Sequence, residues 1–132
     1  MRVIVYGLGA VGGVVAASLA RAGREVVGIA RGAMLEAVRS DGLRLSSVEG
    51  EDRLRLDCVG HPSEIDFRPD DAILLCMKGQ DTDPALAALR EAGVAMQPVF
   101  CCQNGVENER RALRIFPNVH GVTVMMPATY VA

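Results

Sequence analysis

The chain has 132 residues, a formal net charge of −2, 50% hydrophobic residues and no tryptophan. This length suits one domain, with an aliphatic core of the kind that fills a parallel sheet covered by helices. The small net charge gives no broad attraction to nucleic acid or to an anionic membrane, so neither is expected as a partner. Glycines and arginines interrupt the longest apolar stretch, and no basic leader precedes a small-residue cleavage site, so a cytoplasmic location is expected.

The N-terminal residues follow a strand, helix, strand pattern. A β-branched run over 2–6 stops at Gly7, which predicts a buried strand that ends in a turn. Residues 11–22 are rich in Ala and Leu and end at Gly23, which predicts a helix. Residues 25–30 form a second apolar run. The three elements fit within about 30 residues, as a βαβ unit requires.

The next segment predicts a short helix, a hairpin and a loop. The helix is expected over 32–40. Residues 43–46 and 53–56 alternate apolar and polar on either side of 48–52, which predicts a hairpin insertion with one solvated face. Residues 60–71 hold two prolines and several charges, so they are expected to form a connecting loop.

Strands and helices then alternate to the C-terminus. Strands are predicted over 72–77, 98–102 and 119–125, and helices over 84–92 and 106–115. The expected fold class is therefore α/β: a Rossmann-like doubly wound parallel sheet with a β-hairpin insertion, forming one domain over 1–132.

The cysteines and histidines show no spacing typical of a disulfide framework or a metal site. His61 and His120 are isolated from other ligand-type residues, so no bound metal is predicted. The four cysteines are Cys58, Cys76, Cys101 and Cys102. Two of them are adjacent inside an apolar run, which favours reduced, mostly buried thiols; a reactive vicinal pair is the alternative.

A glycine-rich motif lies between the first predicted strand and the first predicted helix. It has the form G-x-G-x-x-G and consists of Gly7, Leu8, Gly9, Ala10, Val11 and Gly12. In such a loop the first glycine permits a tight turn, the second lets the backbone approach a pyrophosphate, and the third lets helix and strand pack closely. The N–H groups and dipole at the helix start favour the anion. Dinucleotide binding is predicted; glycines that serve only the turn and the packing are the alternative.

The residue at the end of the second predicted strand indicates which dinucleotide is bound. An acid often stands there to bind the adenosine ribose of NAD, but this chain has Arg31. Glu25 falls at the beginning of the strand, at the wrong end of the sheet. An arginine can pair bidentately with a 2′-phosphate and offers no acceptor to a 2′-hydroxyl, so NADP(H) is favoured. A solvated surface arginine is the alternative.

Polar residues also follow the next two sheet strands. Lys78 and Gln80 come after one, and Gln103, Asn104 and Gly105 end the other. A lysine there can be a solvated cap, and Asn-Gly is an ordinary turn signal, so each is weak alone. Because all lie at the carboxyl edge where such sheets bind ligands, they are candidate site residues.

Several motifs in order link the chain to a known family. With the glycine loop and the segments 30–33, 41–45, 77–78, 103–105 and 121–123, the chain resembles the ketopantoate reductase (2-dehydropantoate 2-reductase) family over nearly its whole length. The resemblance implies NADPH-dependent reduction of a small 2-keto acid, 2-dehydropantoate, to pantoate for pantothenate and coenzyme A biosynthesis.

The resemblance also assigns roles to residues. The three glycines match the pyrophosphate loop, Arg31 the 2′-phosphate ligand, Lys78 a lysine near the ribose phosphate, and Gln80 a neighbour of the adenine. Asn104 is similar to the asparagine beside the nicotinamide ribose and the substrate. The nearest match to a backbone N–H that holds the carboxamide is Ala128, because Pro127 cannot donate.

Family members continue into a helical second domain with the lysine that acts as general acid. This sequence ends at Ala132, so we expect a domain truncated at its C-terminal end and inactive alone, since ketone reduction needs a proton. Two alternatives stay open: another NADP-dependent 2-keto acid or sugar-acid dehydrogenase, and a non-catalytic nucleotide-sensing domain. A homodimer stays open as the assembly.

Overall fold

A six-stranded sheet forms the centre of the protein in the computed structural model, which describes residues 1–47, 50–102 and 107–121. Its strands run in the order β5-β2-β1-β6-β7-β8, and the paired neighbours are parallel. The strand bounds are β1 Val3–Tyr6, β2 Val26–Ile29, β5 Asp57–Val59, β6 Ala72–Leu75, β7 Val99–Cys101 and β8 Val119–Gly121. The four residues of β2 are all buried, as expected for a strand with both faces covered.

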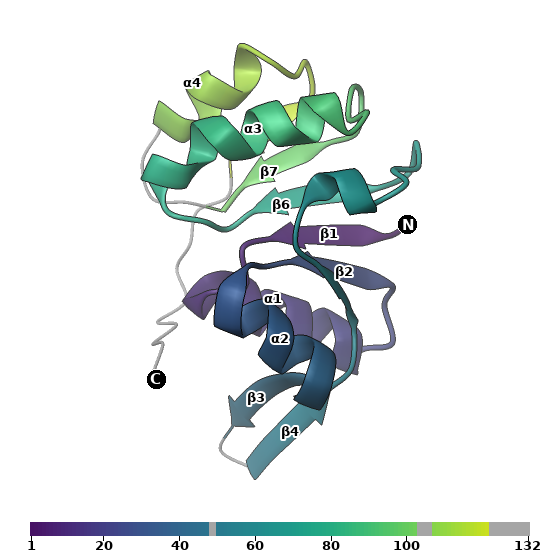
Figure 1. The fold of residues 1–132 in the computed structure, drawn as a ribbon. Coiled ribbons are helices and arrows are strands. Elements are labelled where there is room, and N and C mark those ends of the chain that lie inside the picture. Colours follow the sequence, from purple (N-terminus) through teal and green to yellow (C-terminus); the bar gives the residue numbers. More distant parts are fainter. Residues whose placement is uncertain (48–49, 103–106, 122–132) are drawn as a thin grey trace.

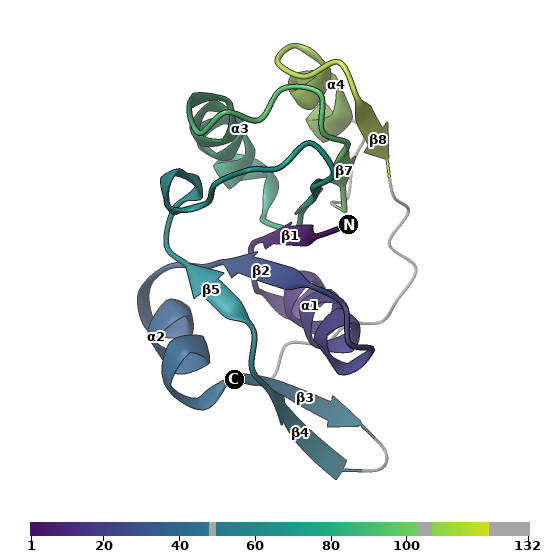
Figure 2. The ribbon, with the colours of Figure 1, turned by 90° about the vertical axis from the view of Figure 1, so that its right-hand side faces the viewer.

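Helices cover both faces of this sheet (Figures 1 and 2). On one face lie α1 (Ala10–Arg21) and α2 (Gly32–Asp41), and on the other lie α3 (Thr82–Glu91) and α4 (Glu107–Leu113). Adjacent residues of β1 show the alternation: Val5 packs with Ala16 of α1, whereas Ile4 belongs to the cluster that holds Leu86 and Phe116. The doubly wound α/β fold predicted from the sequence is confirmed.

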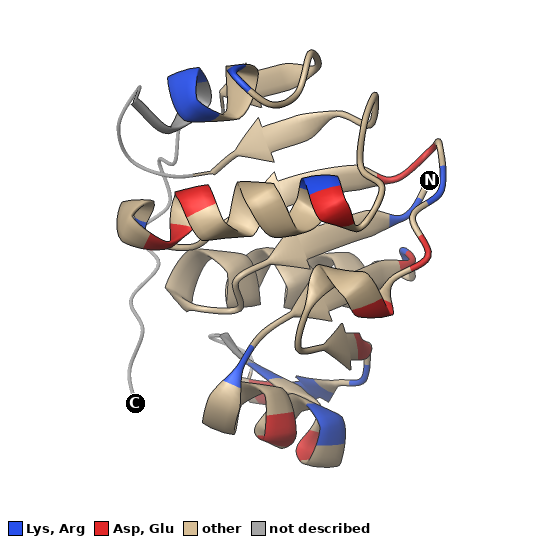
Figure 3. Cartoon of the chain, turned by 45° about the horizontal axis from the view of Figure 1, so that its top comes forward, with Lys and Arg blue, Asp and Glu red and all other residues tan. Residues whose placement is uncertain are grey.

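Charged residues stand mostly in the helices, the hairpin and the connecting segments, with both signs interspersed (Figure 3). The sheet is correspondingly apolar, and the residues of its two core clusters are almost all aliphatic. Within the described ranges, no helix is both long and apolar enough to cross a membrane.

The predicted hairpin is present as a separate two-stranded sheet, β3 (Leu43–Ser47) and β4 (Gly50–Leu54). Its second arm was predicted over 53–56, which is wrong by about three residues. Ser47 pairs with Gly50 and Leu43 with Leu54, so the short connection fixes the register. Leu43 and Leu54 join the core cluster next to α1, which explains why the apolar pair stands at the open end.

Some short elements lie outside the sequence predictions. β5 pairs with β2 through Val27 with Asp57 and Ile29 with Val59, and three residues are too few to show a period of two. A short 3₁₀ turn, η1 (Pro62–Glu64), interrupts the predicted loop. The strands β6 and β7 are shorter than predicted. Of the strand predicted over 119–125, β8 covers the three described residues, and residues 122–125 lie outside the described ranges.

A buried ion pair fixes the amino ends of the central strands. Arg2 Nε and Nη2 donate to the two carboxylate oxygens of Asp71 at 2.8 and 2.6 Å, and Asp71 is fully buried. The Arg68 backbone N–H donates to the same carboxylate at 2.7 Å, and Arg2 also donates to the Asp66 carbonyl at 2.9 Å. Burial alone would raise the pKa of Asp71, but the hydrogen bonds from Arg2 and Arg68 outweigh it and lower the pKa.

We expect Asp71→Asn to lower the free energy of unfolding by about 3 kcal/mol, because it leaves the Arg2 guanidinium buried without its counter-charge. Since the folded-state pKa of Asp71 lies below its unfolded value, this stabilisation is full at neutral pH and is lost as pH falls through the folded-state pKa. Urea unfolding at neutral and acidic pH measures both effects. The matched control is Asp70→Asn, at an exposed neighbour. Equal losses in the two variants would contradict the prediction.

Candidate functional site

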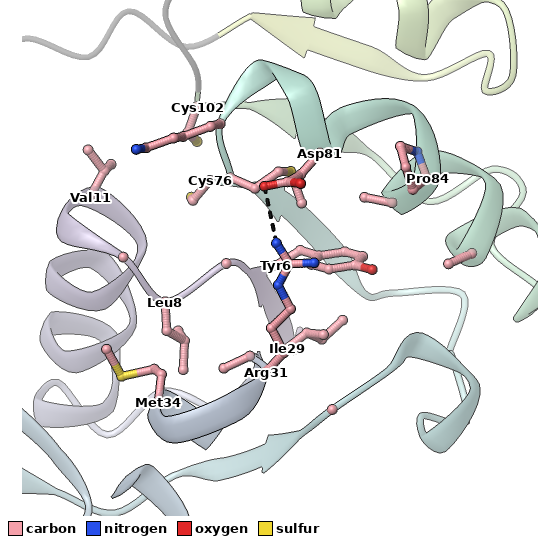
Figure 4. A pocket seen from close by; sticks show the side chains of 18 of the residues that line it. Tyr6, Leu8, Val11, Ile29, Arg31, Met34, Cys76, Asp81, Pro84 and Cys102 are labelled. Carbon is pink, nitrogen blue, oxygen red and sulfur yellow. Dashed lines mark ion pairs between the residues drawn. The ribbon is translucent and has the colours of Figure 1, made fainter. Parts of the chain in front are cut away.

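A pocket of about 1010 Å³ opens at the carboxyl edge of the sheet, where β1 and β6 lie side by side. The chain leaves β1 through α1 on one face and leaves β6 through α3 on the other, so the winding direction reverses between these strands. Open α/β sheets bind ligands at this kind of switch point. The pocket walls come from the glycine loop, the end of β2 and the segment after β6 (Figure 4).

The three glycines of the loop differ in what an added side chain would meet. Gly7 has a φ of +100°, and a Cβ there would lie 3.0 Å from the Met77 backbone nitrogen of the neighbouring segment. A Cβ on Gly12 would overlap the Gly7 carbonyl oxygen, so the start of α1 can approach β1 only if this residue has no side chain. A Cβ on Gly9 would meet no atom of the described residues within 4 Å. The part of the chain that the structure describes therefore leaves the space next to Gly9 open.

The start of α1 faces the pocket with its backbone. Gly9 is the N-cap residue, the first turn holds no acidic residue, and Gly7, Leu8, Gly9, Ala10 and Val11 all line the cavity. The first N–H groups of a helix have no partner within the helix, and its N-terminal dipole end is positive. This arrangement suits an anionic group held by backbone N–H groups. Gly12 lies behind the lining, where it serves the packing.

Arg31 stands at the carboxyl end of β2, where the sequence places it, and is the N-cap residue of α2. Its side chain is 83% exposed, and Nη2 lies 3.4 Å from Oδ2 of Asp81 across the mouth of the pocket (Figure 4). Asp81 closes the short 3₁₀ turn η2 (Gly79–Asp81) that follows β6. Sequence reasoning missed Asp81, although its place three residues after Lys78 could have marked it.

Of the two site residues predicted after β6, Lys78 lines the pocket and Gln80 does not. Lys78 is exposed, precedes η2 as its N-cap and lines the pocket. Gln80 is exposed and is not among the described residues that line it. The turn that carries both is held in place by Arg111 of α4, whose Nη1 donates to the Gly79 carbonyl at 3.1 Å.

The other predicted contacts fall outside the part of the chain that the structure describes. Asn104, with Gln103 and Gly105, and Ala128 are the residues concerned. Their roles stay predictions. Cys102, which directly precedes this segment, lines the pocket, so the end of β7 reaches the site.

Sequence reasoning also missed pocket residues that carry no motif. Tyr6 precedes Gly7 at the end of β1 and lines the cavity, and burial raises the pKa of its hydroxyl while Arg31 opposes this. His61, which the sequence analysis did not count among the site residues, also lines the pocket, and its Nδ1 accepts from the Ser63 N–H at 3.1 Å. In the described ranges, no cluster of His, Cys, Asp or Glu is suited to a metal ion.

Comparison with known proteins gives the family. Residues 3–131 match the protein family described as ketopantoate reductase PanE/ApbA. The chain belongs to this family. Among curated ketopantoate reductases, it is 36% identical over 107 residues to the 2-dehydropantoate 2-reductase of Mesorhizobium japonicum, covering 80% of this chain and 32% of that relative. It is 32% identical over 115 residues to the Pyrococcus horikoshii enzyme of the same name, covering 87% and 36%.

Solved structures of ketopantoate reductases share the fold. The family member from Ralstonia eutropha superposes with a TM-score of 0.82 at 31% identity, covering 97% of this chain and 44% of that one. A D-mandelate dehydrogenase, solved with NADH and anilino(oxo)acetate, reaches 0.84 at 24% identity with 95% and 41% coverage, which shows the fold alone. The chain spans about a third of the length of the curated relatives it matches.

The glycine geometry predicts which positions tolerate a side chain. We expect Gly12→Ala to lower the free energy of unfolding by about 3 kcal/mol, because the added methyl overlaps the Gly7 carbonyl oxygen. Gly13→Ala is the control, since its Cβ would make an ordinary 3.5 Å contact and alanine favours a helix by up to about 1 kcal/mol. Thermal and urea unfolding of both variants test this, and a Gly12→Ala variant as stable as the parent would refute the packing role.

Proposed function

We propose that this chain binds NADP(H) and forms the cofactor-holding part of an NADPH-dependent reductase. The substrate is the 2-keto acid 2-dehydropantoate, and the product is pantoate for pantothenate and coenzyme A biosynthesis. The observation that carries the proposal is the pocket at the switch point, where the open start of α1 and the cations Arg31 and Lys78 line one cavity. The cytoplasmic location expected from the sequence is part of this proposal.

The residues present fit a dinucleotide. No described atom occupies the space that a Cβ at Gly9 would fill, and Gly9 is the N-cap of α1, so this space adjoins the start of the helix. A pyrophosphate in that space would accept hydrogen bonds from the backbone and lie at the positive end of the helix dipole. Because the binding groups belong to the backbone, this part of the site serves NADP and NAD equally.

We propose NADP rather than NAD because of the charged residue at the carboxyl end of β2. Arg31 lies there, while Glu25 lies at the opposite end of β2 and pairs with Arg68 at 3.1 Å. Arg31 and Lys78 together would give a 2′-phosphate two cationic partners. Asp81 opposes them, because its carboxylate holds the Arg31 guanidinium and would repel a phosphate.

The chemistry of the bound cofactor is the delivery of a hydride to the keto carbon. The described residues hold and orient the dinucleotide at the carboxyl edge, and we expect Asn104 to position the nicotinamide ribose and the substrate. The proton for the new hydroxyl would come from the lysine that the family resemblance places in the helical second domain.

A second candidate is another 2-keto acid dehydrogenase with the same fold. The D-mandelate dehydrogenase that superposes on this chain was solved with NADH, so the fold itself accommodates the cofactor without the 2′-phosphate. A chain extended by the family's helical domain would decide between them. NADPH consumption with 2-dehydropantoate supports the proposal, and consumption with aromatic 2-keto acids alone favours the second candidate.

We expect Gly9→Ala to weaken binding of both NADPH and NADH at least tenfold while leaving the fold intact. The added methyl enters the space that the proposal assigns to the pyrophosphate but meets no atom of the described residues within 4 Å, and the Gly9 φ of −79° lies outside the left-handed region that favours glycine. Titration calorimetry measures the affinities, circular dichroism measures the fold, and Gly13→Ala serves as the control. Unchanged affinity in Gly9→Ala would place the dinucleotide elsewhere.

We expect Arg31→Ala to weaken NADPH binding by about tenfold or more and to leave NADH binding nearly unchanged, since only NADPH carries the 2′-phosphate. Asp81→Asn should strengthen NADPH binding a few-fold by removing the opposing carboxylate. Arg24→Ala, at an exposed residue near the other end of β2, is the matched control. The same titrations measure all three, and equal losses of both cofactors in Arg31→Ala would refute the selectivity role.

A further inference from the structure

Two cysteines, each directly after a strand of the sheet, line the pocket side by side. Leu75 of β6 pairs with Cys101 of β7, and the Cys102 N–H donates to the Leu75 carbonyl at 2.9 Å. The next residues, Cys76 and Cys102, therefore stand opposite each other at the carboxyl ends of the two strands. Neighbouring strands lie about 4.8 Å apart, which is within the Cα separation that a disulfide spans.

Successive side chains along a strand point to opposite faces of the sheet, and this decides which cysteines lie close enough to react with each other. Leu75 and Cys101 belong to the core cluster on the α3 and α4 face, whereas Cys76 packs with the cluster on the α1 face. Because successive side chains alternate, Cys102 shares the face of Cys76, and Cys101 points the other way. The structure therefore places Cys102 next to Cys76 on one face of the sheet, whereas the vicinal residues Cys101 and Cys102 face opposite sides.

The two thiols interact and are reachable. Their side chains share a hydrogen bond, neither residue is fully buried, and both line the pocket next to one another (Figure 4). The hydrogen bond from Cys76 lowers the pKa of Cys102, and the same bond together with burial raises the pKa of Cys76. Cys102 is therefore the more readily formed thiolate, and thiolates are the attacking species in disulfide exchange.

We propose that Cys76 and Cys102 form a redox-active dithiol, which small-molecule disulfides of the glutathione type oxidise to an intramolecular disulfide in the lining of the pocket. The Cys102 thiolate attacks one sulfur of RSSR, the S–S bond breaks, a Cys102 mixed disulfide forms and RS⁻ leaves. Cys76, its proton passed to solvent, then attacks Cys102 Sγ and displaces the second RS⁻. The two cysteines are oxidised, RSSR is reduced, and the two thiol protons end on two RSH.

The pair lies against the glycine loop. A Cβ on Gly12 would lie 3.0 Å from the Cys76 Cβ, and one on Gly7 would lie 3.1 Å from the Cys76 carbonyl carbon. Drawing Cys76 toward Cys102 changes the packing directly beneath the loop, so oxidation should weaken dinucleotide binding. This consequence rests on the proposed function, whereas formation of the disulfide does not.

The test is to incubate the folded chain with glutathione disulfide, count free thiols and map disulfides by mass spectrometry. We expect the loss of two thiols and a peptide link between Cys76 and Cys102, reversed by dithiothreitol. Cys76→Ser should stop at a glutathione adduct on Cys102, and Cys58→Ser, at a buried cysteine of β5, should react like the parent. Four unreactive thiols, or a Cys101–Cys102 link, would overturn the proposal.

NADPH titration of the reduced and oxidised chain separates the two proposals. At least a tenfold weaker affinity after oxidation, restored by dithiothreitol, supports the coupling between dithiol and loop. A mapped Cys76–Cys102 disulfide with unchanged affinity overturns the coupling. No binding by the reduced chain, with the disulfide still forming, overturns the proposed function and supports the dithiol.

Discussion

The close approach of Gly12 to the carbonyl of Gly7 is the constraint on which the site depends. Only a residue without a side chain permits it, and it lets α1 begin directly above the end of β1. The helix start then faces the gap between β1 and β6 rather than solvent alone. If α1 lay farther from the sheet, its first N–H groups would not border the pocket that the segments after β2 and β6 also line.

The topology gathers the site from distant parts of the chain. Parallel strands that share one direction place their carboxyl ends together, so Gly9, Arg31, Lys78 and Cys102 reach one cavity although the sequence separates them by tens of residues. The opposite edge stabilises the fold, because the buried pair of Arg2 and Asp71 joins the segment before β6 to β1 there. The ion pair therefore stabilises the amino edge of the sheet, while the carboxyl edge carries the pocket.

The sequence was sufficient where local chemistry dictates structure and insufficient where tertiary contacts do. The glycine loop, the alternation of strands and helices and the place of Arg31 could be predicted, because turn chemistry and strand order decide them. β5 could not, since its three residues become a strand only by pairing with β2. Asp81 and the closeness of Cys76 to Cys102 depend on which segments pack side by side, which the order of residues in the sequence does not show.

The Arg31–Asp81 pair has a consequence for how such a site can change over time. Under the proposed function, backbone N–H groups supply most of the affinity and are fixed by the fold, while cofactor choice falls to two side chains at the rim. Arg31 is 83% exposed and Asp81 36% exposed, so exchanging them disturbs little packing, and surface substitutions of this kind change stability by only about 0.5 kcal/mol. On that proposal, cofactor preference can evolve independently of folding, because Arg31 and Asp81 belong to neither core cluster.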